Sequence, residues 1–454
     1  MLSMWVTPRE IPIDTNRCPG TSWHFPWPAV SRHPQSHSAS AKFRIGVHSM
    51  KQSYDVLVVG AGPAGSTAAE RLAAAGVDVA VLEEHPVIGE PVDCTGVVGT
   101  EAFECFDLPR SIVVGSVSEV TIHSPAGIPA TYQANEPLAY IVDRAELDRT
   151  LAARAEDAGT TFLLSTQAVD VSRDHRGIAV TCRRPEGEVC QLSAKVLILA
   201  GGPRFAFHEH LGLGTSSVLW RSAHTELPGD GLPHAQVYLG RDVAPGAFAW
   251  AVPIKHDGMP RVRVGVNSHC DAPRYLRKLC EDKFPHLLAG DGSLPYRSWV
   301  VPVIPPSKTY ADRVLAVGDA AGQVKPTSGG GIYYGMLSAR EGADTVVEAL
   351  RRGTLGRDGL STYERRWRAC LGFDLKLGTF FRRLFARMTD QDVDDLFRTL
   401  HTHGLLARIT EKVSFDWHRE LILFLLRHPT LARIFMRRWL HGNAEPAFSD
   451  LPAL

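Results

Sequence analysis

The chain has 454 residues, of which 44% are hydrophobic and 22% are charged, and 49 basic residues balance 49 acidic ones. This composition is typical of a globular protein and excludes a largely disordered one, and the zero net charge gives no indication of a nucleic-acid partner. No apolar run approaches the about 20 residues that a transmembrane helix needs, and the length favours two or three domains.

The first 50 residues are rich in Pro, Ser and His and show no periodicity, whereas Met50 precedes a regular strand pattern. We expect a disordered N-terminal extension, with a misassigned start codon or a processed transit segment as alternatives. The eight cysteines include no CxxC pair and no Cys/His cluster with zinc spacing. They predict reduced thiols in a cytoplasmic protein and no metal site.

Residues 54–86 form a βαβ pattern: an apolar strand, the sequence GAGPAG, a helix, and a second strand that ends at Glu83. In such a turn Gly60 makes the tight bend, Gly62 lets a pyrophosphate approach, and Gly65 lets the helix pack closely. An acidic residue at the end of the second strand accepts hydrogen bonds from the adenosine ribose. We therefore predict a dinucleotide site with Glu83 on the ribose, since Glu84 should point to the other face.

Residues 140–159 predict an amphipathic helix with Leu147, Leu151 and Ala155 on one face. Asp143 is a plausible N-cap. Arg144, the next residue, is either a surface salt-bridge partner or a ligand contact.

Three segments at 234–240, 246–254 and 261–268 alternate apolar and polar residues and are separated by turn signals. They predict an antiparallel sheet. Phe248 and Trp250 fall on one face of their strand, where they are either core residues or part of a binding wall.

Residues 314–336 run an apolar strand into Asp319 and then place three glycines, 329–331, before a helix. Asp319 lies at the carboxyl end of its strand, where open α/β sheets bind ligands. The bare backbone predicts that N–H groups at the helix N-terminus approach a cofactor edge.

Residues 351–454 are mostly helical and carry more Lys and Arg than Asp and Glu. The stretch 418–442 predicts an amphipathic basic helix with Arg427, Arg433, Arg437 and Arg438 on its polar side. Such a helix either packs against the body of the protein or lies on an anionic membrane surface.

Together these motifs resemble the geranylgeranyl reductase family, FAD enzymes with the p-hydroxybenzoate hydroxylase fold. The resemblance is carried by GAGPAGSTAA (60–69), IGEPVDCTGVV (88–98), APGAFAWAVP (244–253), GDAAGQVKPTSGGGI (318–332) and the helical stretch 363–397. It implies an α/β fold with a Rossmann-type FAD-binding domain, an inserted antiparallel-sheet substrate domain and a helical C-terminal region. The expected divisions are 51–115 with 140–215 and 300–350 for FAD, 116–139 with 216–299 for substrate, and 351–454 for the helical region.

The resemblance also implies the site residues. Cofactor contacts are expected at Gly60, Gly62, Ala64, Gly65, Glu83, Cys94, Thr95, Val97, Arg144, Ala168, Asp319, Gly330, Gly331 and Ile332. Phe248 and Trp250 would line an apolar substrate tunnel, although Phe248 stands where a tyrosine is commoner in the family. Cys94 lies in the loop between Glu90 and Gly99 that covers the flavin, where it either takes part in catalysis or is an inert buried thiol.

The expected activity is FAD-dependent reduction of carbon–carbon double bonds in a geranylgeranyl or other prenyl chain carried by a lipid, quinone or pigment. The reductant, NAD(P)H or ferredoxin, and the oligomeric state stay open. Two alternatives remain: a flavin monooxygenase or halogenase of the same fold, and a flavoprotein that relays electrons to quinone at a membrane. We expect a cytoplasmic protein, with peripheral membrane contact through the basic C-terminal helices as an open possibility.

Overall fold

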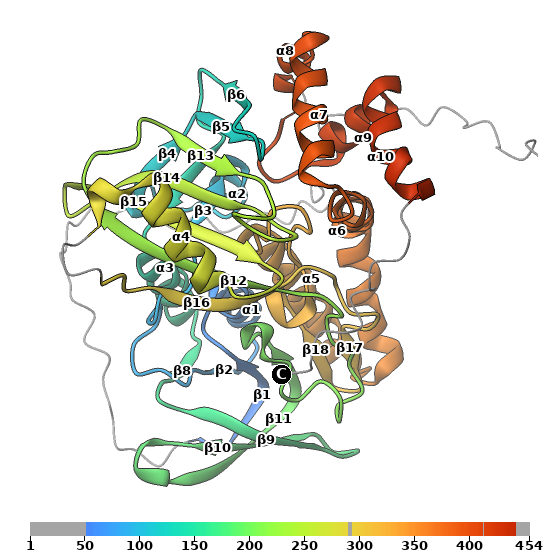
Figure 1. Cartoon of the computed structure of the whole chain (residues 1–454). Helices are drawn as coiled ribbons and strands as arrows, with labels where there is room; N and C mark the ends of the chain where they lie inside the picture. The colour runs from blue at the N-terminus through green and yellow to red at the C-terminus, as the bar shows by residue number, and fades with distance from the viewer. Residues whose placement is uncertain (1–50, 289–292, 412, 442–454) are drawn as a thin grey trace, which may run out of the picture. The chain divides into compact units, whose positions relative to one another are not determined.

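The computed structural model describes residues 51–288, 293–411 and 413–441 (Figure 1). The prediction of a disordered extension at residues 1–50 lies outside these ranges. Within them, the strands form three β-sheets.

The first sheet contains the parallel strands of the predicted βαβ unit. Across it run β17 (Tyr310–Ala311), β18 (Val314–Ala316), β11 (Val189–Leu199), β1 (Ser53–Val59), β2 (Val79–Leu82) and β8 (Thr161–Leu163), and β10 (Ile178–Arg183) and β9 (Gln167–Arg173) extend β11 as an antiparallel ladder. From β18 to β8 all neighbours are parallel. Because both faces of such a sheet are covered, β1 reads as a continuous apolar run in which Val56 and Val58 are fully buried.

Helices cover this parallel sheet. They are α1 (Pro63–Ala74), α3 (Arg144–Asp157), α5 (Ile332–Arg352) and the long α6 (Arg357–Phe385). α1 packs against α3 and α5, and α5 packs against α6. The predicted face of α3 is confirmed, since Leu147, Leu151 and Ala155 are buried in this core, and the Asp143 carboxylate caps the helix by accepting from the Glu146 N–H.

The second sheet is built from two separate parts of the chain. Its order is β16 (Arg297–Pro302), β12 (Leu219–Pro228), β15 (Met259–Ser268), β14 (Ala249–His256), β13 (Ala235–Tyr238), β5 (Glu119–His123) and β6 (Pro129–Gln133). Neighbouring strands are antiparallel except for β13 and β5, which pair in parallel. The three predicted segments are β13, β14 and β15, and they pair antiparallel as predicted. The parallel pair arises because β5 enters from a distant part of the chain and not through a hairpin. Helix α4 (Ala272–Lys283) packs on one face of the sheet through Leu276 and Leu279.

A third, small sheet joins the two large ones. It consists of β3 (Val97–Gly99), β7 (Ala139–Val142) and β4 (Val113–Val117), and the short helix α2 (Thr100–Cys105) follows β3. Ile141 and Val117 of this sheet pack in one cluster with Trp250 and Val252 of β14.

The C-terminal part of the described chain is helical, as predicted. After α6 come α7 (Asp390–Thr402), α8 (Leu406–Thr410), α9 (Arg419–Arg427) and α10 (Pro429–His441), which lie together beside β5 and β6 (Figure 1). The described residues of the predicted stretch 418–442 form two helices and not one, because Pro429 starts α10 and its ring cannot continue α9. Leu425, Leu431 and Phe435 are buried, so these helices pack against the body.

Candidate active site

The three glycines of the first turn have different surroundings. Gly60 has φ +101°, and a Cβ atom on Gly65 would lie 1.9 Å from the Gly60 carbonyl oxygen, so the first helical turn packs directly on the bend. A Cβ atom on Gly62 would meet nothing within 4 Å. Gly62 is the N-cap of α1 and has no side-chain partner for the free N–H groups, so this helix N-terminus is open to an anion.

Glu83 is held over this turn. One carboxylate oxygen accepts from the Ala61 N–H at 2.9 Å, and the other accepts from the His85 N–H at 2.9 Å and lies 2.7 Å from His85 Nδ1. We expected Glu84 to point to the other face. It also lines the cavity described below, where its carboxylate pairs with Arg204 at 2.6 Å. With Glu84 neutralised by an arginine, Glu83 is the carboxylate that faces the glycine turn.

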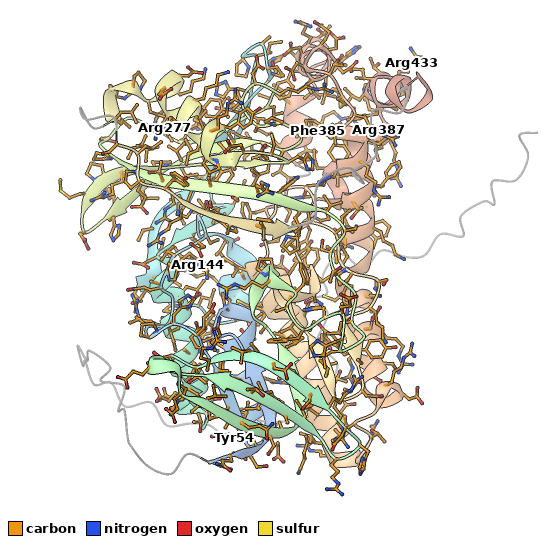
Figure 2. The ribbon with its side chains drawn as sticks, turned by 60° about the horizontal axis from the view of Figure 1, so that its bottom comes forward. Tyr54, Arg144, Arg277, Phe385, Arg387 and Arg433 are labelled. Carbon is orange, nitrogen blue, oxygen red and sulfur yellow. The ribbon has the colours of Figure 1, made fainter. Side chains whose placement is uncertain are left out.

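Arg144 begins α3 and is buried beside the loop that carries Cys94. Its Nη2 donates to Asp148 at 2.6 Å, while Nε is buried with no hydrogen-bond partner among the described residues. Burial alone would lower the pKa of Arg144, but the Asp148 carboxylate and the Cys94 thiol raise it above its ordinary value. Arg144 is therefore a fixed cation and not a surface salt-bridge partner (Figure 2).

Asp319 follows β18 in a single 3₁₀ turn, Gly318–Ala321. Its carboxylate accepts no hydrogen bond from the described residues, and burial raises its pKa to about 6 although Arg144 lowers it. A Cβ atom on Gly331 would lie 2.6 Å from Asp319 Oδ1, so the carboxylate rests against bare backbone. Gly331 is the N-cap of α5, and no side chain caps that helix end either.

These elements surround one cavity of about 1300 Å³. The predicted residues that line it are Gly60, Gly62, Ala64, Glu83, Cys94, Arg144, Ala168, Asp319, Gly331 and Ile332. Gly65, Thr95, Val97 and Gly330 lie outside the lining: Gly65 is packed under the turn, Val97 is in β3, and Gly330 lies against Lys325. Their contacts with a cofactor stay predictions.

Phe248 and Trp250 are not among the residues that line the cavity. Their ring centroids are 5.6 Å apart, Trp250 Nε1 donates to Thr95 Oγ1 at 3.1 Å, and the Trp250 ring covers Gly265, where a Cβ atom would lie 2.2 Å away. The second sheet lines the cavity instead with Arg221, Ser222, Ser298, Trp299, Val300 and Val301. Substrate contact by Phe248 and Trp250 stays a prediction; in the structure Trp250 bonds to the Cys94 loop through Thr95, and Phe248 packs against Trp220.

In the segment after β11, sequence reasoning did not predict Phe205 or His208 as site residues. Phe205, with φ +50°, and His208 line the cavity, and His208 Nε2 lies 2.7 Å from the Ala320 carbonyl oxygen. Burial lowers the pKa of His208, so the ring is neutral and donates this bond, which joins the segment to the Asp319 turn. The end of an apolar strand followed by two glycines could have marked this loop, but no local pattern marks His208.

The lining residues fit a flavin dinucleotide. Two helix N-termini without side-chain caps, at Gly62 and Gly331, offer N–H groups to anionic parts of a ligand. The carboxylate of Asp319 and the Nε of Arg144 are an acceptor and a donor with no protein partner among the described residues. A ligand with hydroxyl groups, a pyrophosphate and ring carbonyls satisfies all of them.

Comparisons with known proteins give the same picture. The sequence profile of the FAD binding domain family matches residues 53–227. Digeranylgeranylglycerophospholipid reductase 2 of Methanothermobacter thermautotrophicus is 30% identical over 397 residues, which cover 84% of this chain and 98% of that protein. The corresponding reductase of Methanosphaerula palustris is 29% identical, with 84% and 96% covered.

Solved structures share the fold. A geranylgeranyl bacteriochlorophyll reductase-like protein from Thermoplasma acidophilum superposes with a TM-score of 0.74 at 24% identity, covering 85% of this chain and 99% of that one. The halogenase PltM superposes with a TM-score of 0.60 at 16% identity, covering 85% and 92%. At these identities the superpositions establish the architecture alone.

Proposed function

The chain belongs to the digeranylgeranylglycerophospholipid reductase family of FAD-dependent oxidoreductases, and from this premise we propose that it saturates carbon–carbon double bonds in the prenyl chains of a lipid. The observation that carries the proposal is that one cavity is lined both by most of the predicted cofactor residues and by strands of the second sheet. One ligand-binding space thus has room for both a cofactor and a substrate chain.

We assign each of these cavity residues a role in FAD binding from its position. Gly62 and the start of α1 receive the pyrophosphate, Glu83 the adenosine ribose, and Asp319 the hydroxyl groups of the ribityl chain. Arg144 places a permanent positive charge beside the Cys94 loop. When bound and reduced, FAD supplies a hydride equivalent, and an isolated alkene then needs a proton at its second carbon.

We assign the Cys94 thiol as the donor of this proton. Its Sγ accepts a weak hydrogen bond from the Gly96 N–H at 3.4 Å, and it faces the cavity next to Arg144. Cys94→Ala should lower turnover at least tenfold while FAD affinity stays within about threefold of wild type. Unchanged turnover would leave Cys94 as an inert wall residue.

The activity itself is tested with purified protein, FAD, dithionite and a digeranylgeranylglycerophospholipid in detergent. Mass spectrometry should show the addition of two hydrogen atoms for each double bond reduced, and Asp319→Ala should abolish the products. Oxygen-dependent NADPH consumption without a saturated product would favour the monooxygenase or halogenase alternative. Electron transfer to quinone without a saturated product would favour the relay.

We place the membrane contact on the outward side of α6. Phe373 and Phe380 are 56% and 50% exposed. The exposed cations Lys376 and Arg383 lie along the same helix and Arg387, labelled in Figure 2, lies just after it, with no ion pair to the described residues. Aromatic and basic side chains in this mixture suit the interface of an anionic bilayer. Within the described residues no helix is both long and apolar enough to cross a membrane.

Vesicle sedimentation tests this surface. The protein should sediment with vesicles containing anionic lipid and be released by salt, and Phe373→Ser with Phe380→Ser should abolish sedimentation while FAD binding is retained. If the variant sedimented as well as wild type, the membrane contact would lie elsewhere on the molecule.

A further inference from the structure

A short segment between α8 and α9 reaches back to the glycine-rich loop beside the cavity. We call residues 414–418 the strap. Lys325, in the glycine-rich loop, donates from Nζ to the Phe415 carbonyl oxygen at 3.0 Å and to the Asp416 carboxylate at 2.9 Å. Trp417 Nε1 donates to Glu101 of α2 at 2.6 Å. Three further contacts hold the strap: Tyr334 OH donates to the Asp416 carbonyl oxygen, Thr327 pairs with His418, and His418 bonds back to Phe415.

The Lys325–Asp416 pair is unusually well buried for two charges. The side chains are 4% and 3% exposed, and Lys325 Nζ also lies 4.0 Å from the centre of the Phe415 ring. Taking two charges out of water is expensive, so such a pair is weak as a source of stability, whereas removing one partner leaves a costly buried charge. We therefore ask which part of the backbone the Lys325–Asp416 pair holds in place.

The Lys325–Asp416 pair holds the glycine-rich loop in place. Lys325 closes the loop with two backbone bonds, from its N–H to the Gly330 carbonyl oxygen at 3.1 Å and from the Gly329 N–H to its own carbonyl oxygen at 2.8 Å. A Cβ atom on Gly330 would lie 2.7 Å from Lys325 Cε, and one on Gly99 would lie 1.8 Å from Asp416 Oδ2. The ion pair thus fills the space between two stretches of bare backbone, and a side chain on Gly330 would meet Lys325.

The neighbours of Gly330 are the ones that face the cavity. Gly329 and Gly331 both line it, and Gly331 caps α5 and touches the Asp319 carboxylate. We propose that Lys325 and Asp416 are positioning residues that hold these two glycines in the FAD-binding arrangement, so that the strap couples the C-terminal helices to cofactor affinity. The inference depends on FAD binding and not on the identity of the substrate.

The test compares three variants of the full chain. Asp416→Asn breaks the ion pair, and Lys325→Met combined with Asp416→Asn removes both charges, so that this protein folds even where the single variant does not. Asp344→Asn is the control, because it removes the exposed Arg71–Asp344 pair, which joins α1 to the same helix α5 away from the cavity. FAD affinity is measured by fluorescence titration well below each melting temperature, and amide exchange is measured in FAD-free protein.

Both strap variants should bind FAD at least tenfold more weakly, and the amides of residues 329–331 should exchange faster. Asp344→Asn should stay within twofold of wild type. A folded double variant with wild-type FAD affinity would overturn the inference, as would weaker binding with unchanged exchange at 329–331. Because these measurements use no prenyl substrate, they remain valid if the proposed reductase activity is disproved. Equally, wild-type FAD affinity in the strap variants would not disprove the reductase activity.

Discussion

At the scale of single residues, the site depends on where side chains are missing. Gly62 leaves open space at the start of α1, whereas Gly65 is in contact with the bend beneath it. Gly331 leaves space for the Asp319 carboxylate, and Gly330 leaves space for Lys325. Glycines that look equivalent in the sequence therefore border open space in one case and packed protein atoms in the next.

Two alanine substitutions separate these roles. Gly62→Ala should leave the melting temperature of FAD-free protein nearly unchanged, since φ −70° and ψ −178° suit alanine, but should weaken FAD binding at least tenfold by blocking the pyrophosphate. Gly65→Ala should destabilise the protein itself, because its Cβ would overlap the Gly60 carbonyl oxygen. Thermal melts with and without FAD measure both effects, and equal behaviour of the two variants would contradict this assignment.

Asp319 should make the FAD-free protein less stable as the pH rises. Its pKa is raised to about 6 in the folded state, against about 3.9 for an unperturbed aspartate, so the folded state binds more protons between these values. Stability is then lost as pH rises through this window. Asp319→Asn does not titrate, so its advantage in melting temperature over wild type should grow from pH 4 to pH 6 and stay constant above. A pH-independent difference would show that the carboxylate is not buried as described.

At the scale of elements, the C-terminal helices are attached to the sheets by buried polar contacts as well as by apolar packing. Asp394 of α7 is buried and accepts from Ser124 Oγ at 2.6 Å and from the Ala126 N–H at 2.9 Å, in the turn between β5 and β6. The strap makes the corresponding attachment at the cavity, through Lys325 and Glu101. Both attachments join segments that are about 90 to 320 residues apart in sequence.

Replacing Asp394 tests the first attachment. Asp394→Ala leaves the Ser124 hydroxyl and the Ala126 N–H without their acceptor and should lower the free energy of unfolding by about 1.5–3 kcal/mol. The neighbouring Asp395→Ala, which removes the exposed pair with Arg398 and an exposed hydrogen bond from Gln391, should cost less than about 1 kcal/mol. Chemical denaturation measures both, and equal losses would mean that Asp394 is not a buried acceptor.

At the scale of the whole molecule, the cavity is assembled from distant parts of the chain. Its walls include Gly62 and Glu83 near the start, Arg144, Trp299 of the second sheet, and Gly331. A ligand that contacts all these parts holds the two large sheets and α5 together. Its binding should therefore stabilise the folded chain as a unit.

FAD should raise the melting temperature of the described unit, by an amount that corresponds to about 2.7 kcal/mol when free FAD exceeds its dissociation constant a hundredfold. Riboflavin, which lacks the pyrophosphate and adenosine that we propose Gly62 and Glu83 bind, should give a much smaller shift at the same concentration. Differential scanning fluorimetry compares them. An unchanged melting temperature with FAD would refute the proposed site and every role derived from it.

Local sequence was sufficient for the parts of this protein that depend on backbone chemistry. The GAGPAG turn, Glu83 at the end of β2, the Asp143 cap and the glycines before α5 follow from short-range rules of turns, caps and strand ends, and the structure has each of them there. The family resemblance added Arg144 and Cys94, which the structure brings to the same cavity.

Only the tertiary structure decided which side chains meet across the fold. The parallel pairing of β13 with β5, the neutralisation of Glu84 by Arg204, the placing of Trp250 under Thr95 and the burial of Lys325 against Asp416 all join distant segments. Such contacts are set by how whole sheets and helices pack, and no local pattern in the chain encodes them. Periodicity placed Phe248 and Trp250 on one face of a strand, but packing decided what that face meets.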